Sequence, residues 1–253
     1  FRSWLAGENW RIKAFEDGQD IYCASASAMF GVPVEKDGIN GDLRKKGKIA
    51  ELALGYGGSV GALTSMGALK MGLSETELPD LVISWRNSNP AICKFWWDCD
   101  MAAINAITGK CATRVGRIGF TYENGMMFIK LPSGRRLAYV KPRMALNKFG
   151  KEGITYWGVG ESKKWMRIET YGPKLVENIV QATARDILVE GMLRIDKAGL
   201  DIVGHIHDEV IVEAPYGVSS VDEINGFLAT VPEWADGLPL AAAGFESPFY
   251  KKD

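Results

Sequence analysis

The alternation of apolar and polar positions is clearest between Ile202 and Ala214, in the segment IVGHIHDEVIVEA. Apolar side chains recur at every second residue on both sides of a polar centre, a pattern typical of two β-strands. The centre consists of His207, Asp208 and Glu209. We therefore predict a β-hairpin with two adjacent carboxylates at an exposed tip, where oxygen ligands could hold a divalent cation. Taken alone, an Asp-Glu pair is more often an ordinary solvated turn.

Helical and strand periodicities predict the elements of the remaining chain. Helices are expected at Asp20 to Phe30, Asp42 to about Leu54, Val60 to Gly72, after a capping box of Ser74 and Glu77, along the apolar stripe from Ile92 to Ile107, within Glu169 to Gly199, and after Ser219 or Ser220. Short strands are expected from Gly116 to Val159, with turns at Asn124-Gly125 and Ser133-Gly134. The segment 238–245 (LPLAAAGF) is expected to form a closing strand. The predicted fold class is α+β.

Two of these helices carry polar side chains at regular spacing. Arg44, Lys48, Leu52 and Tyr56 are four residues apart and therefore share one slowly drifting stripe. Such a stripe can bind a polyphosphate through its two cations and offer flat contact to a base or sugar, although a solvated basic turn beside an apolar one is the commoner interpretation.

The second set lies on the long helix after Glu169. Asn178, Gln181 and Arg185 are three and four residues apart there and could contact base edges or sugars, but a solvated helix face explains them equally well.

Composition narrows the possible classes. With 253 residues, 47% of them hydrophobic, the chain can bury a full core. Its net charge of -1 argues against a uniformly basic nucleic-acid binder. Four cysteines without C-x-x-C spacing and two histidines make a zinc site unexpected. No signal peptide or apolar run of about 20 residues is present, so we expect a cytoplasmic protein without a membrane segment.

Five segments, in order, resemble the family A DNA polymerases of the bacterial polymerase I type, and phage-encoded members in particular. The HDE of His207 to Glu209 is similar to the palm motif, and Arg44, Lys48 and Tyr56-Gly57 are similar to the fingers-helix motif that binds the incoming nucleotide. The other three similar segments are DIYCASASAMFG, LPSGRRL with Arg135 and Arg136, and the segment from Gln181 to Asp186.

This resemblance implies a polymerase right-hand fold fragment: an incomplete palm segment at 1–9, helical fingers with a small β insert at 10–165, and an antiparallel palm sheet at 166–253. It also implies nucleotidyl transfer from a dNTP to the primer 3′-hydroxyl with two Mg²⁺ ions. Asp208 would bind metal with Glu209 in support, and His207 would lie near the primer end.

The resemblance assigns further residues to the substrates. Arg44 and Lys48 would hold the triphosphate, Lys48 also donating a proton to pyrophosphate, and Tyr56 would stack near the template base. The residues expected to contact primer-template DNA are Gln181, Arg185, Asn178, Arg135 and Arg136.

Three departures qualify the resemblance. Leu52 stands where the family usually carries Phe or Tyr, and Asn178 is three rather than four residues before Gln181. The family's other metal-binding aspartate lies upstream of the WLAGE of Trp4 to Glu8, and the sequence begins at Phe1 without it. We therefore expect this chain alone not to polymerise, and to be a fragment or to work with an N-terminal polymerase chain that supplies the aspartate.

Three other functions remain open. They are a non-catalytic nucleotide- or nucleic-acid-binding remnant of a phage polymerase, a single-subunit RNA polymerase, and an unrelated metal-dependent phosphotransferase. Glu209 after the aspartate favours the DNA enzymes over the RNA enzymes, and the order of the five segments disfavours the phosphotransferase.

Overall fold

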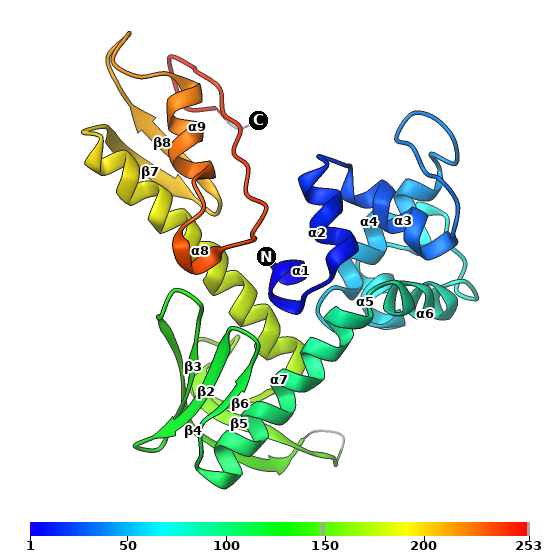
Figure 1. Cartoon of the computed structure of the whole chain (residues 1–253). Coiled ribbons are helices and arrows are strands. Elements are labelled where there is room, and N and C mark those ends of the chain that lie inside the picture. Colours follow the sequence, from blue (N-terminus) through cyan, green and yellow to red (C-terminus); the bar gives the residue numbers. More distant parts are fainter. Residues whose placement is uncertain (148–149, 252–253) are drawn as a thin grey trace. The chain divides into compact units, whose positions relative to one another are not determined.

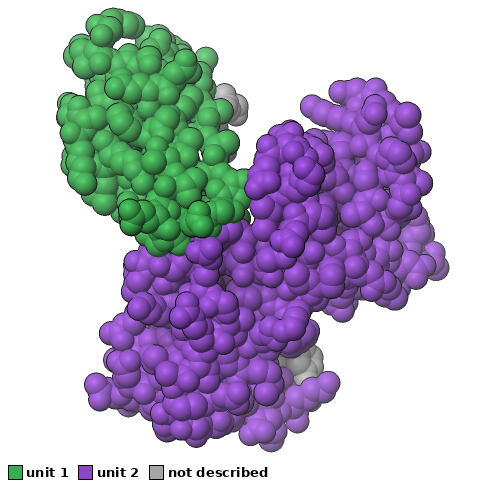
Figure 2. Space-filling view, viewed as in Figure 1, with its two compact units in different colours: residues 1, 181–253 green, residues 2–180 purple. Residues whose placement is uncertain are grey.

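The computed structural model describes residues 1–147 and 150–251 and divides into two compact units. One unit comprises residues 2–180, and the other comprises Phe1 with residues 181–253 (Figure 2). The boundary between the units, after residue 180, differs from the predicted subdomain boundaries after residues 9 and 165. The assignment of fingers and palm therefore stays a prediction. Helices and an antiparallel sheet together confirm the predicted α+β class.

Helices form the first half of the larger unit (Figure 1). They are α1 (Arg2–Ala6), α2 (Asn9–Glu16), α3 (Ile21–Phe30), α4 (Leu43–Leu54), α5 (Val60–Ser65), the 3₁₀ turn η1 (Leu69–Met71), α6 (Leu78–Ser88) and α7 (Pro90–Gly109). Asp20 caps α3 by accepting from the amides of Tyr22 and Cys23 at 2.9 and 3.1 Å. Gly31, at a φ of 68°, ends the same helix in the left-handed conformation.

The expected helix from Val60 to Gly72 is wrong in its length. It stops at Ser65, because Gly67 and Gly72 have φ values of 87° and 90° that a right-handed helix does not allow. Asp42, predicted as a cap, makes no capping hydrogen bond with its side chain. The box of Ser74 and Glu77 forms only in part: the carboxylate of Glu77 accepts from the amide of Ser74 at 2.8 Å.

The second half of this unit is a six-stranded antiparallel sheet in the order β1-β2-β3-β4-β5-β6, larger than the small insert predicted. Its strands are β1 (Thr113–Val115), β2 (Ile118–Glu123), β3 (Met126–Lys130), β4 (Arg136–Leu146), β5 (Glu152–Val159) and β6 (Trp165–Thr170). The predicted turn at Asn124-Gly125 is confirmed, with positive φ values at both residues.

Helix α7 covers one face of this sheet and carries the predicted apolar stripe. The stripe residues are buried, among them Phe95, Trp96 and Cys99. They meet the inward side chains of the strands, such as Phe120 and Ile129, which are fully buried. Trp96 also stacks on Trp85 of α6 at 5.9 Å between ring centroids, so one core joins the helices to the sheet.

Helix α8 (Gly172–Lys197) crosses the division between the units. The smaller unit continues with the hairpin of β7 (Asp201–Ile206) and β8 (Glu209–Glu213), the helix α9 (Val221–Ala229) and the 3₁₀ turn η2 (Glu233–Ala235). The predicted hairpin and the cap of α9 at Ser220 are confirmed. The expected strand at 238–245 is wrong: this segment pairs with no described strand and forms none.

Candidate nucleotide and metal sites

Helix α4 carries the predicted stripe. Its amphipathic sequence buries Ile49, Ala50, Ala53 and Leu54 and leaves the opposite side accessible. Arg44 and Lys48 both lie over the ring of Tyr22, at 5.3 and 5.8 Å from its centroid, which places the two cations on the same side of the helix. Leu52 is 51% exposed and extends this side.

Arg44 is already engaged in an ion pair that sequence reasoning missed. Its Nη2 lies 2.7 Å from Oδ2 of Asp20, the residue that caps α3. Burial tends to raise the pKa of Asp20, but the hydrogen bonds from Arg44 and the backbone amides lower it overall. A phosphate bound to Arg44 would therefore compete with a carboxylate that is held ionised. The capping position of Asp20 was the one signal in the sequence.

Tyr56 follows the end of α4 and is half-buried. The guanidinium of Arg2 lies 5.2 Å from its ring centroid, a cation–π contact that fixes the ring. Burial raises the pKa of the Tyr56 hydroxyl. At the next residue, Gly57 has a φ of 78°, and an added Cβ would lie 2.6 Å from Pro173. Both backbone conformation and space therefore require glycine at position 57.

The buried side of α4 holds a polar network around Glu51, which the sequence analysis did not identify. Oε1 accepts from Ser25 Oγ at 2.7 Å and from Trp85 Nε1 at 2.8 Å, and Arg11 Nη2 also pairs with this oxygen. Oε2 accepts from Arg11 Nη1 at 2.9 Å and from Arg2 Nη2 at 3.2 Å. The network therefore joins α1, α2, α3 and α6 to the helix that carries the stripe.

The single negative charge of Glu51 pairs with two guanidinium groups, those of Arg2 and Arg11. Burial tends to raise the pKa of Glu51, but Arg11, Arg2 and the hydrogen bond from Ser25 lower it overall. Glu51 is the one acidic residue of α4 and lies between buried alanines. That unusual placement was a signal that the sequence offered.

The hairpin of β7 and β8 presents the predicted carboxylates. Ile206 pairs with Glu209, so His207 and Asp208 form a two-residue loop, and both are exposed. His207 has a φ of 54° in this turn. Carboxylate oxygens suit Mg²⁺, but the described residues contain no group of three or more His, Cys, Asp or Glu side chains placed to hold a metal. Among the described residues, Asp208 and Glu209 are therefore two candidate oxygen ligands for a cation.

The predicted DNA-contacting residues lie in two places. On α8, Gln181 and Arg185 are exposed, whereas Asn178 is half-buried and donates from Nδ2 to the hydroxyl of Tyr139 at 2.9 Å. On the sheet, Arg135 and Arg136 are exposed.

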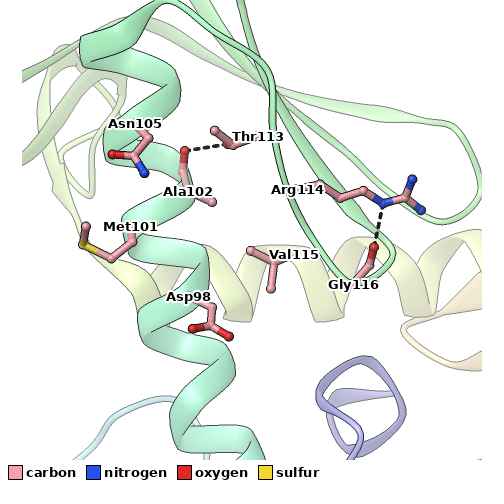
Figure 3. Close-up of a pocket in the computed structure, with 8 residues that line it drawn as sticks. All are labelled: Asp98, Met101, Ala102, Asn105, Thr113, Arg114, Val115 and Gly116. Atoms are coloured by element: carbon pink, nitrogen blue, oxygen red, sulfur yellow. Dashed lines mark hydrogen bonds between the residues drawn. The ribbon is translucent and has the colours of Figure 1, made fainter.

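A separate hollow lies between α7 and the strand β1 with its following turn (Figure 3). It measures about 430 Å³ and is lined by Asp98, Met101, Ala102, Asn105, Thr113, Arg114, Val115 and Gly116. None of the predicted site residues lines it, so we assign it no part in the candidate site.

Across the described residues, no helix combines the length and the hydrophobicity that crossing a bilayer requires.

No family model matches the chain, but two whole sequences and a solved structure are similar to it. The DNA polymerase of Bacillus phage SP02 is 52% identical over 253 residues, which are 99% of this chain and 39% of that protein. DNA polymerase I of Rhizobium leguminosarum is 36% identical over 80 residues, 32% of this chain and 7% of the relative.

A solved structure shares the fold. It is the POL domain of Pol1 from M. smegmatis in complex with DNA primer-template and dNTP, with a TM-score of 0.57 and 18% identity, covering 95% of this chain and 35% of that one. The present chain thus spans about two fifths of the phage relative. From its sequence identity over almost every residue and the order of its motifs, the chain belongs to the same family as the phage SP02 enzyme, the family A DNA polymerases.

Proposed function

We propose that this chain forms the nucleotide-binding fingers and the metal-binding part of the palm of a template-directed DNA polymerase. The observation that carries the proposal is the 52% identity to the phage enzyme along the whole chain. The exposed Lys48 of α4 and the exposed Asp208 of the β7–β8 hairpin support it, because both groups are available to ligands.

In this function the stripe of α4 binds the triphosphate of the incoming dNTP. Lys48 is exposed and can approach the phosphates directly, and as an ammonium it can give a proton to the departing pyrophosphate. Arg44 would exchange Asp20 for a phosphate oxygen, replacing one charge-assisted hydrogen bond with another. Leu52 offers apolar contact in place of an aromatic ring, and Tyr56, held by Arg2, presents its ring at the end of the stripe.

The reaction class is attack of a primer 3′-hydroxyl on the α-phosphate of the dNTP, with release of pyrophosphate. A divalent cation, Mg²⁺ in our proposal, would take Asp208 and Glu209 as ligands and would neutralise charge on the phosphates. His207 lies beside them on the same turn, where it can approach the primer end. Gln181 and Arg185 would contact the primer-template from α8. A cytoplasmic location stays a prediction.

A chimaera tests this proposal without any assumption about what precedes Phe1. In it, the present chain replaces the matching 253 residues of the SP02 polymerase. We expect Mg²⁺-dependent primer extension that is lost in Asp208→Asn, whereas Lys48→Ala should lower kcat by about 10²- to 10⁴-fold, the usual contribution of a general acid. Lys94→Ala is the matched control, because Lys94 is an exposed lysine on α7 that is 74% accessible.

Several outcomes would contradict the proposal. A folded chimaera that does not extend a primer, while the parent enzyme does, would argue against polymerase function. Primer-template binding without synthesis in that chimaera would instead favour the non-catalytic DNA-binding module. Equal effects of Lys48→Ala and Lys94→Ala would remove Lys48 from its proposed role.

A further inference from the structure

The face of the six-stranded sheet opposite α7 is open and combines aromatic rings with guanidinium groups. Directly opposed residues of antiparallel strands point to the same face. Val140 opposes Trp157, and Trp157 opposes Arg167, so these three side chains lie on one face. Arg143 opposes Thr155, and Trp165 opposes Val159, which places them on that face as well.

This open face is accessible over β4 to β6. Trp165 is 59% exposed and Val159 is 64% exposed. Arg143 is exposed, and Trp157 and Arg167 are half-buried. Because Val159 and Trp165 oppose each other, they form one exposed apolar patch, and exposed apolar patches rimmed by polar groups are typical of binding surfaces.

The rings and cations of the face are arranged in pairs. The guanidinium of Arg167 lies 5.5 Å from the ring centroid of Trp157. Arg167 is held there because its Nη1 donates to the carbonyl oxygen of Lys141 at 2.7 Å. On the neighbouring strands, Arg136 lies 4.3 Å from the ring centroid of Phe128. Flat surfaces of rings and guanidinium planes therefore recur along the sheet.

Positive charge concentrates in the same part of the chain. Between Arg135 and Tyr171 the sequence has nine lysines and arginines and three glutamates, although the net charge of the whole chain is -1. Burial lowers the pKa of Arg167 and nearby Arg143 lowers it further, as expected when two cations lie close together. An anion bound between them would relieve this repulsion.

We propose that the open face, centred on Trp157, Trp165, Arg143 and Arg167, binds single-stranded DNA. Stacking of bases on aromatic rings, together with phosphate contacts from flanking cations, is the general means by which proteins hold single strands. Duplex DNA fits less well, since its bases are stacked on one another and offer no free ring face. This inference rests on the proposed polymerase function, in which the bound single strand is the template ahead of the copied region.

Fluorescence anisotropy with labelled oligo(dT) tests this assignment on the chain itself. Trp165→Ala is expected to weaken binding by at least about fivefold, the lower end of what the loss of one base–aromatic stack causes. Trp165→Phe should restore most of the affinity because it keeps a ring. Trp97→Ala is the matched control: Trp97 is 55% exposed but lies on α7, which covers the other face.

Arg143→Gln provides a second, independent measurement. The plot of log affinity against log salt should become less steep by about 0.7, the value for one lost phosphate contact to a single strand. Circular dichroism would verify that each variant is folded.

Three results would each overturn the proposal: equal affinities of Trp165→Ala and Trp97→Ala, an unchanged salt slope in Arg143→Gln, or competition by duplex DNA as effective as by single strands. No nucleotide is incorporated in this assay. Failure here would therefore leave the polymerase proposal intact, and an inactive chimaera would leave the binding face intact.

Discussion

Replacement of Glu51 by glutamine should destabilise the larger unit strongly. The Glu51 side chain is 8% exposed and pairs with both Arg2 and Arg11, whose side chains are 14% and 1% exposed. Glutamine has nearly the same shape, but its NH₂ end cannot accept a hydrogen bond, so donors that now point at one carboxylate oxygen would lose their acceptor. The two guanidinium groups would also lose the negative charge of Glu51, with which both form ion pairs.

The expected magnitude follows from these contacts. Removal of one partner from a buried ion pair costs about 3–5 kcal/mol. For a unit of this size that corresponds to a Tm lower by about 6 to 20 °C. Differential scanning calorimetry would measure it. Glu123→Gln is the matched control, since its pair with Arg136 at 3.2 Å is about half exposed on both sides and should contribute less than about 1 kcal/mol.

The same variant has a characteristic dependence on pH. The pKa of Glu51 is lower in the folded state than its ordinary value of 4.5. The unfolded chain therefore takes up this proton first as pH falls, and the stability contributed by Glu51 is present above about pH 4.5 and is lost below it. The Tm difference between the wild-type chain and Glu51→Gln should shrink as pH falls below 4.5. A difference that is small at pH 7, or constant down to pH 3, would refute this account of the network.

Three further substitutions probe the packing of the larger unit. Gly47→Ala should lower the free energy of unfolding by about 1–3 kcal/mol, because its Cβ would lie 2.2 Å from the carbonyl oxygen of Tyr22. Gly61→Ala has nothing within 4 Å of its Cβ and should raise the free energy of unfolding, measured with denaturant, by up to about 1 kcal/mol. Equal effects of the two substitutions would contradict a close approach of α3 and α4. Tyr139→Phe should cost about 1–2 kcal/mol by leaving the amide of Asn178 without its acceptor. Burial raises the pKa of the Tyr139 hydroxyl to about 12. If the phenol signal lost in Tyr139→Phe belonged to a group that ionises near 10 in a spectrophotometric titration, the enclosure of Tyr139 would be disproved.

The parts of the fold that sequence alone predicted are those governed by local rules. Helix α4 and the β7–β8 hairpin follow from periods of 3.6 and 2 in their apolar residues. The cap at Ser220 and the turn at Asn124-Gly125 follow from side-chain hydrogen bonding and from the left-handed backbone that these turns need.

The parts that sequence missed depend on partners far along the chain. The donors to Glu51 come from residues 26 to 49 positions away, which no local pattern can bring together. The segment 238–245 has strand-like letters, but a strand exists only where a second strand pairs with it. Arg44 has the spacing of a ligand-binding cation, yet its ion pair with Asp20 depends on how α3 packs against α4.

The irregular pairing of β4 with β5 has a consequence for how this sheet can vary. Val140 opposes Trp157 but Arg143 opposes Thr155, so one extra residue sits in β4 between these pairs, where Lys141 has a φ of 45°. Loss of that single residue would give regular pairing, with the one remaining residue opposite Tyr156 and Arg143 still opposite Thr155 on the same face. Relatives can therefore lose one residue at 141–142 without changing which side chains the end of β4 presents on each face.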